Sequence, residues 1–403
     1  MRNNFERTKL GELADTSYGY TAKASFDISG PKFLRITDIQ DGTVKWDAVP
    51  SCEISEKDSK KYKLQANDIV FARTGATTGK SFLIEGQENA VAASYLIRLR
   101  IKSEIILPRF LMYYFQSSEY WNKISEGTTG SAQGGFNASK LNNLEIPIAP
   151  LDEQNRIVAV LDEAFEGIAK ATANAERNLA NARELFNSTL RSLIQDAAVQ
   201  SEMLTLAEIA DQFGRGKSKH RPRNDPALYG GAYPFIQTGD VRNAGHFVNT
   251  YSQTYNKQGL KQSKLWPRGT ICITIAANIA ETGILTFDAC FPDSVIGVVA
   301  NPTRAQTDYV EYLLQYFKTQ LQAAGKGSAQ DNINLGTFEN VRFPFPKLEV
   351  QNKIVSQLNE LDAICSVLEK RNEEKLAVLS ELKQSLLHKA FSGELTSTKE
   401  IAA

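Results

Sequence analysis

The chain has 403 residues, of which 42% are hydrophobic and 23% are charged, and its formal net charge at pH 7 is zero. This length suits two globular domains with connecting elements. No apolar run approaches the roughly 20 residues that a membrane helix needs, and the N-terminal segment lacks the apolar core of a secretory signal. We therefore expect a cytoplasmic protein without membrane contact. Four cysteines without a C-x-x-C pair and only three histidines argue against a zinc site or a disulfide framework.

The first 150 residues read as a mixed domain of short strands, turns and one helix. Runs of β-branched and aromatic residues at 33–36, 69–72 and 95–99 predict strands, because turn-forming Gly, Asp and Asn residues bound them. The segment 108–117 opens with proline and then places aromatic and apolar residues at helical spacing, which predicts a helix. Strands and helices that are mixed in this way predict an α+β domain.

Two long helices are the clearest secondary-structure prediction. Apolar residues recur at alternating intervals of four and three from Ile157 to Leu185 and again from Ile354 to Leu386, as in a coiled-coil seam. Asn178 and Lys375 occupy aligned seam positions, where polar residues fix register at a cost in stability. We expect helices of roughly 40 residues, or about 60 Å at 1.5 Å per residue, packed against each other in antiparallel directions.

The second half of the chain repeats the first. Gly130-Ser131-Ala132-Gln133 returns as Gly327-Ser328-Ala329-Gln330, at an offset of 197 residues. The start of the first helix returns in the second at the same offset, as Gln154, Ile157, Val158 and Leu161 against Gln351, Ile354, Val355 and Leu358. A period of this length marks two copies of a whole domain and not a solenoid.

The predicted fold class is therefore α+β, with two pseudo-repeated domains separated by two long helices that form an antiparallel coiled coil. The predicted segments are a first domain at 1–150, a first helix and linker at 151–202, a second domain at 203–346, and a second helix with a C-terminal tail at 347–403. Each domain has a slight excess of basic residues, and the helices carry the excess of acidic residues. Binding to phosphate must therefore come from local patches.

Motifs for catalysis are incomplete. Gly216-Lys217-Ser218 resembles the end of a phosphate-binding loop, but the glycine that the motif requires five residues earlier is Asp211. Gly79-Lys80-Ser81 fails in the same way, because position 74 is threonine. The three histidines are scattered, so no catalytic triad can be assembled. The sequence predicts a chain without catalytic, metal or cofactor sites.

The second domain carries the clearest candidate for nucleic-acid binding. Five cations alternate within nine residues of a turn-rich segment, namely Arg215, Lys217, Lys219, Arg221 and Arg223. Such a segment suits contact with phosphates or base edges. A solvated run of charge is the alternative interpretation.

The first domain offers a strand that runs into a loop of small residues ending in a cation. Arg73 could make two parallel hydrogen bonds to a guanine or a phosphate there, and Thr74 and Lys80 lie in the same loop. Gln133 and Gln330 occupy equivalent places in the two glycine-serine loops, where glutamine could read adenine or the loop could be a simple connector. The remaining candidate DNA contacts are Arg35, Gln237, Arg242 and Lys326.

The junctions between domains and helices resemble the specificity subunit of type I restriction-modification systems. The resemblance lies in residues 147–158, in their copy at 344–355, and in the tail Ala390-Phe391-Ser392-Gly393-Glu394-Leu395. Two prolines, then L-x-x-Q-x-x-I-V and a long helix, form a pattern that is present twice and is specific. The second copy departs slightly, with Glu349-Val350-Gln351 where the first has Glu153-Gln154.

This resemblance implies a subunit that is not itself an enzyme. Each domain would read one half of a split target in double-stranded DNA through the major groove, and the helices would act as a ruler between them. Two methyltransferase subunits would dock on the assembly and supply S-adenosylmethionine, so this chain would need no cofactor, and motor-nuclease subunits can join. The resemblance does not tell which bases are read or how far apart the half-sites lie.

Two other classes of function remain open at this stage. One is an enzyme with unrecognised chemistry, which turnover by the purified chain alone would reveal. The other is a protein-binding adaptor built from duplicated domains and a coiled coil, which failure to retain DNA in the presence of the methyltransferase would support.

Overall fold

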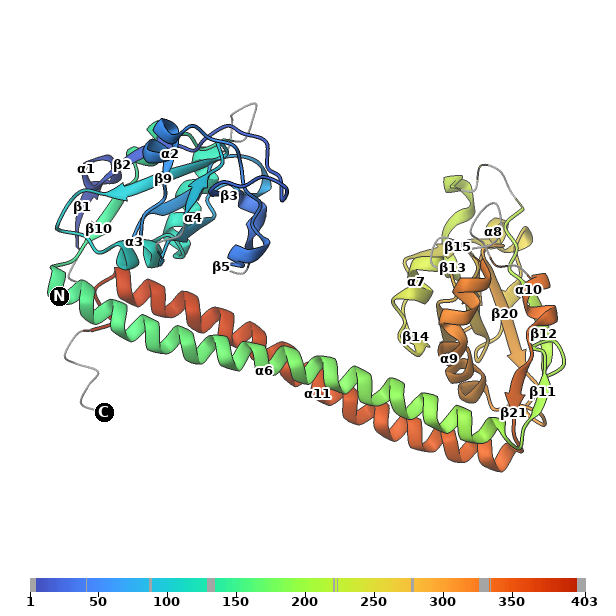
Figure 1. Ribbon diagram of the computed structural model, residues 1–403. Helices are drawn as coiled ribbons and strands as arrows, with labels where there is room; N and C mark the ends of the chain where they lie inside the picture. Colours follow the sequence, from blue (N-terminus) through green and yellow to red (C-terminus); the bar gives the residue numbers. More distant parts are fainter. Residues whose placement is uncertain are drawn as a thin grey trace. The chain divides into compact units, whose positions relative to one another are not determined.

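The computed structural model describes residues 5–40, 42–86, 89–128, 135–219, 222, 224–276, 279–325, 333 and 335–396. Its chain divides into two compact units, one made of residues 1–176 and 373–403 and the other of residues 177–372 (Figure 1). Each unit therefore contains one of the two mixed domains, part of the first long helix and part of the second.

The mixed domain of the first unit is built from short elements. They are β1 (Glu6–Lys9), α1 (Leu10–Leu13), β2 (Ala14–Tyr18), β3 (Lys32–Leu34), η1 (Ile36–Asp38), β4 (Ile39–Gln40), β5 (Thr43–Val44), η2 (Trp46–Ala48), α2 (Glu56–Tyr62), β6 (Ile69–Ala72), η3 (Gly75–Thr77), β7 (Ser81–Leu83), β8 (Ala90–Ala92), β9 (Leu96–Ile101), α3 (Pro108–Tyr114), α4 (Ser118–Thr128), α5 (Ala138–Asn142) and β10 (Glu145–Ile148).

A four-stranded antiparallel sheet in the order β2-β9-β6-β7 forms the centre of this domain. All four residues of its strand β6 are buried. Since the side chains of a strand alternate between its two faces, both faces of β6 are covered. Ile69 and Phe71 join the core cluster that includes α3, α4 and the long helices. Val70 and Ala72 join a second cluster, which includes residues of the parallel pair β3 and β8.

The mixed domain of the second unit repeats this plan. Its elements are β11 (Glu202–Leu204), β12 (Ala210–Arg215), η4 (Pro226–Leu228), β13 (Tyr229–Phe235), α7 (Thr238–Arg242), β14 (Phe247–Val248), β15 (Gln253–Tyr255), α8 (Lys257–Lys261), β16 (Leu265–Trp266), β17 (Ile271–Thr274), β18 (Thr282–Leu285), β19 (Ala289–Cys290), β20 (Val295–Ala300), α9 (Thr307–Gly325), α10 (Leu335–Asn340) and β21 (Phe343–Phe345).

The central sheet of the second domain has the order β12-β20-β17-β18-β14. The strand β17 alternates as β6 does, with Ile271 and Ile273 in the cluster shared with the long helices and Cys272 in the opposite cluster. The second face is covered differently, by a four-stranded sheet in the order β15-β13-β19-β16. Elements over one face of the sheet are thus shared by the two domains, and those over the other face have diverged.

The strand prediction at 69–72 is confirmed, and the others shift by a few residues. The segment 33–36 forms β3 only as far as Leu34, because Asp38 accepts a hydrogen bond from the Arg35 amide at 2.8 Å and turns the chain into η1. The strand predicted at 95–99 runs from Leu96 to Ile101. The helix predicted at 108–117 ends at Tyr114.

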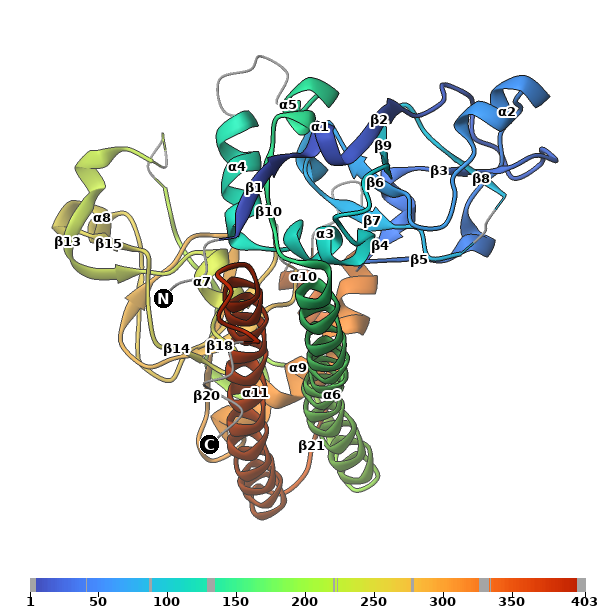
Figure 2. The ribbon, with the colours of Figure 1, turned by 90° about the vertical axis from the view of Figure 1, so that its left-hand side faces the viewer.

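The two long helices are α6 (Leu151–Ala198) and α11 (Leu348–Phe391), and they lie side by side in Figures 1 and 2. Their directions are antiparallel within each unit, as expected. In the first unit, Leu161 shares a core with Leu387, and the ammonium of Lys383 lies 5.0 Å from the ring centroid of Phe165. In the second unit, the Cys365 thiol donates to the Ala182 carbonyl at 3.4 Å.

The buried stripe of the helix pair corrects the predicted heptad spacing. Leu185, Leu368 and Leu382, which the four-three pattern places in the seam, are 48%, 41% and 45% exposed. On α11 the seam passes instead through Ile354, Cys365, Leu376 and Leu387, which are eleven residues apart and buried or half-buried. An α-helix has 3.6 residues per turn, so each heptad falls about 20° short of whole turns and each eleven-residue repeat runs about 20° past them, which is the smaller drift per residue.

The predicted polar seam positions are wrong for the same reason. Asn178 and Lys375 both point to solvent. The buried polar residue in the seam of α11 is Asn372, which is 9% exposed and donates to the Leu368 carbonyl at 2.7 Å. It lies at the end of the second unit's share of α11.

Candidate nucleic-acid interface

A buried glutamine joins each domain to its long helix. The Gln154 amide accepts from the Leu107 N–H at 2.9 Å and donates to the carbonyls of Ile105 and Ala149, both at 2.7 Å. These neighbours precede a helix of the same unit, α3 or α6. The side chain is fully buried, and its amide oxygen and both amide N–H groups are hydrogen-bonded inside the protein.

The second copy of the motif makes the same attachment with equivalent partners. The Gln351 amide accepts from the Gln306 N–H at 2.9 Å and donates to the carbonyls of Arg304 and Pro346 at 3.1 and 2.8 Å. Gln351 is also fully buried. The Q of the repeated sequence pattern is therefore a structural clamp that orients a domain on a helix.

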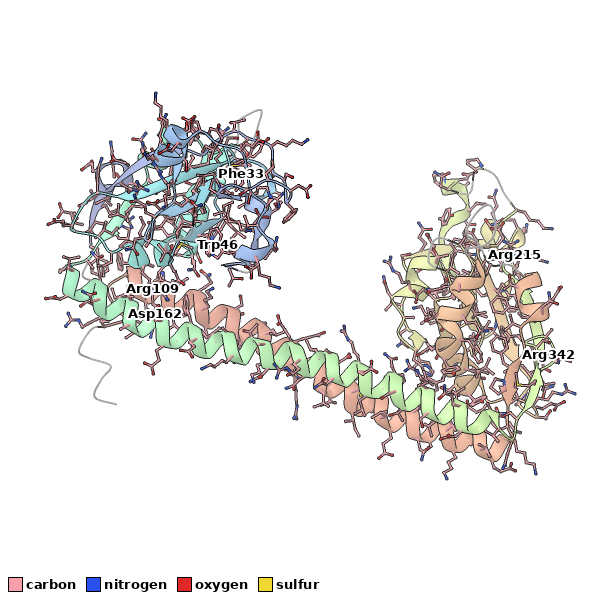
Figure 3. The ribbon with its side chains drawn as sticks, viewed as in Figure 1. Phe33, Trp46, Arg109, Asp162, Arg215 and Arg342 are labelled. Atoms are coloured by element: carbon pink, nitrogen blue, oxygen red, sulfur yellow. The ribbon has the colours of Figure 1, made fainter. Side chains whose placement is uncertain are left out.

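A repeated tyrosine makes a second attachment. The Tyr113 hydroxyl of α3 donates to the Asp162 carboxylate of α6, and the Tyr312 hydroxyl of α9 donates to the Asn359 amide oxygen of α11 at 2.7 Å. Asp162 also accepts from the guanidinium of Arg109 at 2.7 Å, and Figure 3 shows these two side chains where the first domain meets α6. Each domain is thus held on the helices by polar contacts at two points.

The second domain adds a histidine between two carboxylates at this junction. His246 contacts Glu311 through Nδ1 at 2.5 Å and Asp308 through Nε2 at 3.1 Å, and its ring stacks on Tyr312 with centroids 4.4 Å apart. Burial alone would lower the pKa of His246, but the hydrogen bonds and ion pairs to both carboxylates outweigh it and raise the pKa to about 9. The imidazole is therefore a cation at neutral pH.

A glycine in each domain brings two backbone segments close together. A Cβ on Gly19 would lie 2.2 Å from the Ala93 carbonyl oxygen, and one on Gly216 would lie 2.2 Å from that of Phe291. Only glycine permits this close approach. Tyr18 and Arg215, which precede the two glycines, therefore occupy equivalent places.

In the second domain the predicted basic segment borders a polar cavity. Arg215, Lys217 and Lys219 are all exposed. The segment is fixed to the rest of the domain by the Lys217 N–H, which donates to the Phe291 carbonyl, and the Lys219 N–H, which donates to the side chain of Gln262 at 2.6 Å. Burial lowers the pKa of Lys264, and the nearby positive charge of Lys217 lowers it further.

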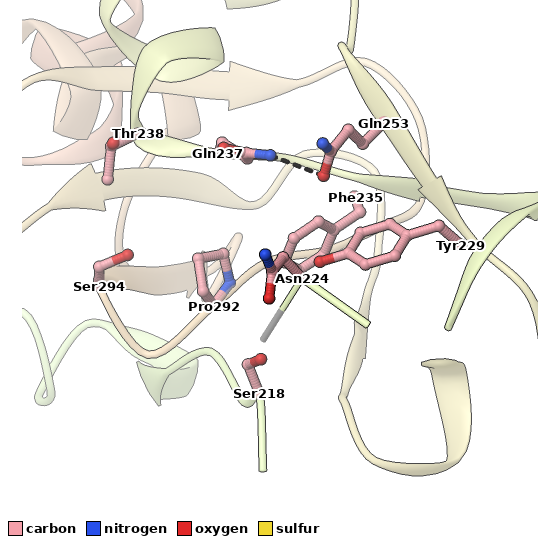
Figure 4. A pocket seen from close by; sticks show the side chains of 9 residues that line it. All are labelled: Ser218, Asn224, Tyr229, Phe235, Gln237, Thr238, Gln253, Pro292 and Ser294. Atoms are coloured by element: carbon pink, nitrogen blue, oxygen red, sulfur yellow. Dashed lines mark hydrogen bonds between the residues drawn. The ribbon is translucent and has the colours of Figure 1, made fainter. Parts of the chain in front are cut away.

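The cavity holds about 450 Å³, and Figure 4 shows how its side chains face one another. The Gln237 amide donates to the Gln253 amide oxygen at 2.7 Å, and the rings of Tyr229 and Phe235 lie below this pair. Its lining consists of Ser218, Asn224, Tyr229, Phe235, Gln237, Thr238, Gln253, Pro292 and Ser294. Amides above aromatic rings and beside cations are the groups with which proteins contact nucleic acids.

In the first domain the predicted residues gather around one turn. The guanidinium of Arg73 donates from Nε to the Ser94 carbonyl at 3.2 Å and lies 4.9 Å from the ring centroid of Tyr18. Thr74 precedes the 3-10 turn η3, and Lys80 ends the same loop with an exposed side chain. Tyr18 was not among the predicted contacts, although its place before Gly19 aligns it with Arg215.

Two predicted arginines are engaged elsewhere. Arg35 makes a two-point ion pair with Asp38, with its Nε at 3.0 Å and its Nη2 at 2.7 Å from the carboxylate. Its counterpart Gln237 begins a helical turn in the same way, since its N–H donates to the Asp240 carboxylate at 2.8 Å. Arg242 lines a separate cavity of about 610 Å³ beside His246, within reach of α6 and α11 and not with the basic segment.

Five of the predicted contacts lie outside the described residues. They are Gln133, Arg221, Arg223, Lys326 and Gln330. In the parts of the chain that the structure does describe, no three His, Cys, Asp or Glu side chains are grouped so that they could hold a metal ion. Within the same parts, no helix has the length and apolar character to cross a membrane.

The sequence matches the type I restriction modification DNA specificity domain twice, at residues 3–176 and 199–377. The chain therefore belongs to this family, whose members carry the specificity domain of type I restriction-modification systems.

Individual relatives agree over most of the chain. A putative type I restriction enzyme MjaX specificity subunit of Methanocaldococcus jannaschii is 23% identical, with 97% of this chain and 96% of that protein covered. The type I restriction enzyme EcoDI specificity subunit of Escherichia coli is 38% identical, with 86% and 82% covered.

Solved structures share the fold. A chain from a type I R-M system superposes with a TM-score of 0.78 at 19% identity, covering 98% of this chain and 99% of that one. The HsdS subunit from Thermoanaerobacter tengcongensis superposes with a TM-score of 0.55 at 19% identity, covering 98% of each chain. The α+β class with two repeated domains and a coiled coil is thus confirmed.

Proposed function

We propose that this chain is the DNA-sequence-specificity subunit of a type I restriction-modification complex. The observation that carries the proposal is the paired design of the two units. Each has a mixed domain clamped to a long helix by a buried glutamine, and each presents an arginine beside a glycine turn. One such domain per half-site would read a bipartite target in double-stranded DNA.

The proposed role needs partners that supply the chemistry. Two methyltransferase subunits would bind S-adenosylmethionine and modify adenine, motor-nuclease subunits can join, and this chain would act in the cytoplasm without catalysis or a cofactor of its own. Support for partner binding comes from apolar side chains that the eleven-residue seam leaves outside. Among them are Ile364 and Val367 in the second unit, at 51% and 53% exposure, and Val378 in the first, at 60%.

The test is to express the chain with its methyltransferase subunit in a host that lacks adenine methylation and to map the modified bases across the genome. We expect a single bipartite sequence with a fixed gap. Retention of the methyltransferase without DNA binding would support the adaptor function instead. Turnover by the purified chain alone would support an enzyme.

A matched control exchanges one domain at a time. Replacing residues 203–346 with the domain of a related subunit should change one half-site and leave the other unchanged, because each domain reads by itself. A change in both half-sites would contradict independent reading.

A further inference from the structure

Both domains hold one guanidinium against an equivalent backbone carbonyl. Arg73 donates from Nε to the Ser94 carbonyl at 3.2 Å in the first domain. Arg215 donates from Nε to the Asp293 carbonyl at 2.7 Å in the second. Neither contact is a product of the sequence repeat, since the two arginines do not align.

The hydrogen-bond register shows that the two carbonyls are equivalent. The Gly19 N–H donates to Leu96 at 3.0 Å, as the Gly216 N–H donates to Val295 at 2.9 Å. One residue earlier on each facing strand, Tyr95 accepts from the Arg73 N–H at 3.2 Å, and Ser294 accepts from the Ile275 N–H at 3.0 Å. Ser94 and Asp293 therefore stand at the same point of the turn before β9 and β20.

The same register shows that the arginines come from different strands. Arg215 ends β12, and its counterpart at the end of β2 is Tyr18. Arg73 follows β6, and its counterpart after β17 is Ile275, which is 2% exposed. The arginine has thus changed strands between the two domains, and each domain keeps one arginine and one aromatic or apolar partner at this turn.

Each guanidinium is held through its Nε group and presents its two Nη groups to a ligand. The Nε bond to a carbonyl fixes the plane of the group, and neither guanidinium makes another hydrogen bond or ion pair among the described residues. Arg215 is exposed and Arg73 half-exposed. Two Nη groups on a fixed plane are suited to an oxyanion, which accepts two parallel hydrogen bonds.

Local charge in the second domain is compatible with an anion. Asp293 contributes a carboxylate to the turn, and the exposed Lys217 and its neighbour Lys264 add two cations to the same domain. In the first domain the turn residue is the neutral Ser94, and the ring of Tyr18 packs on the guanidinium.

We infer that Arg73 and Arg215 each bind a phosphate of the DNA backbone, at equivalent places in the two half-sites. This inference rests on the proposed function. The domains differ in their other surface residues, as expected if they read different bases. The guanidinium, in contrast, is held at one place in both domains although it comes from different strands. It must therefore contact a feature that both half-sites share. The phosphate backbone is the part of DNA that does not depend on sequence.

The test uses the complex assembled with its methyltransferase subunit and measures the dissociation constant against salt concentration. Arg73→Gln and Arg215→Gln should each reduce the slope of log K against log salt by about 0.9, the value for one phosphate contact. The reduction should be the same on a target duplex and on an unrelated duplex. The methylated sequence should not change. Arg177→Gln, an exposed charge removed from α6, is the matched control and should leave the slope unchanged.

A rescue variant separates this role from a structural one. Tyr18→Arg combined with Arg73→Ile rebuilds in the first domain the pair found in the second, and it should bring the slope back from its value in Arg73→Gln. Failure to restore it would overturn the equivalence of the two sites. Relaxation of one base position in the methylated sequence would overturn the phosphate assignment in favour of base reading. An unchanged slope in both single variants would overturn the contact altogether.

These outcomes are distinct from failure of the proposed function. A wild-type complex that marks no bipartite sequence would contradict sequence reading, while the slope on an unrelated duplex would still report whether the arginines contact phosphate.

Discussion

The two domains meet the helices with different charged groups in the same place. In the first domain, Asp162 on α6 accepts from Tyr113 and from the guanidinium of Arg109. In the second, the equivalent helix residue is the neutral Asn359, which accepts from Tyr312. The cation there is His246, which is satisfied by carboxylates on α9 instead.

This difference teaches that the attachment geometry is kept while its chemistry is free to change. The glutamine clamp and the tyrosine are present in both copies, and each glutamine satisfies buried backbone groups that water cannot reach. The ionic partner is partly solvated and can be replaced. The outer faces have diverged further, with a second four-stranded sheet and a basic segment in the second domain alone.

The glutamine clamps should give the largest effect on stability, and an equal one in the two domains. Gln154→Leu or Gln351→Leu keeps the shape but leaves one N–H and two carbonyls buried without partners. Each unpaired group costs about 1–3 kcal/mol, so we expect three of them to decrease the free energy of unfolding by roughly 3–9 kcal/mol. Denaturant titration measures it. Asn155→Ala on the exposed side of α6 is the control, and a decrease below about 1 kcal/mol for either leucine variant would contradict the clamp.

The helix pair should set the gap between half-sites in steps of its own repeat. Two eleven-residue repeats add about 33 Å to each helix at 1.5 Å per residue, which is about one turn of B-DNA. They continue the spacing of Ile354, Cys365, Leu376 and Leu387, so the buried stripe of α11 should extend through the insertion. Such a chain should methylate the same half-sites with a gap about ten base pairs wider.

Insertions of other lengths sharpen this prediction. One eleven-residue repeat per helix keeps the seam but adds about half a turn of DNA, so the half-sites would face opposite sides and activity should fall. One heptad per helix adds about 10 Å, or about three base pairs, which also turns one half-site around the duplex and should lower activity. Methylation mapping reads out all three, and an active complex with the original gap would show that the helices are a tether and not a ruler.

The ionic partners predict a pH dependence in the second unit alone. The pKa of His246 is raised to about 9, above the value of about 6.5 in an unfolded chain. Its contribution to stability is therefore fully present below pH 6.5 and is lost as the pH rises through 9. The decrease should be at most about 3 kcal/mol.

Thermal unfolding between about pH 6 and pH 9.5 brackets this titration and measures the effect. His246→Gln should flatten the profile of the second unit. Arg109→Gln in the first unit is the matched variant, and it should lower stability by a similar amount at every pH, because arginine stays charged over this range. A pH profile that His246→Gln leaves unchanged would contradict the assignment.

The basic segment should give the smallest effect, confined to DNA binding. Replacing Lys217 and Lys219 together with Arg221 and Arg223 by alanine should lower the salt slope of the complex by about 0.9 for each phosphate that these side chains bind. Folding should not change, because the side chains of Lys217 and Lys219 are exposed. Binding isotherms at several salt concentrations measure it, and an unchanged slope would make the segment a solvated run of charge.

Sequence alone determined the duplication, the α+β class and the two long helices. Those features follow from local signals, since a repeat at one offset and a periodic apolar pattern are legible without a fold. The repetition of Gln154 as Gln351 can be read from the sequence. Their function as clamps cannot, because their partners include loops about 50 residues away along the chain.

Tertiary structure decided which helix face is buried and where the arginines meet. On α11 the buried residues follow eleven-residue steps, and Leu368 and Leu382, which the heptad places in the seam, are exposed. Arg73 and Arg215 share no sequence position, and only the pairing of β6 with β9 and of β12 with β20 brings them to equivalent carbonyls. Contacts between strands depend on register across the sheet, and register is set by the packing of the whole domain.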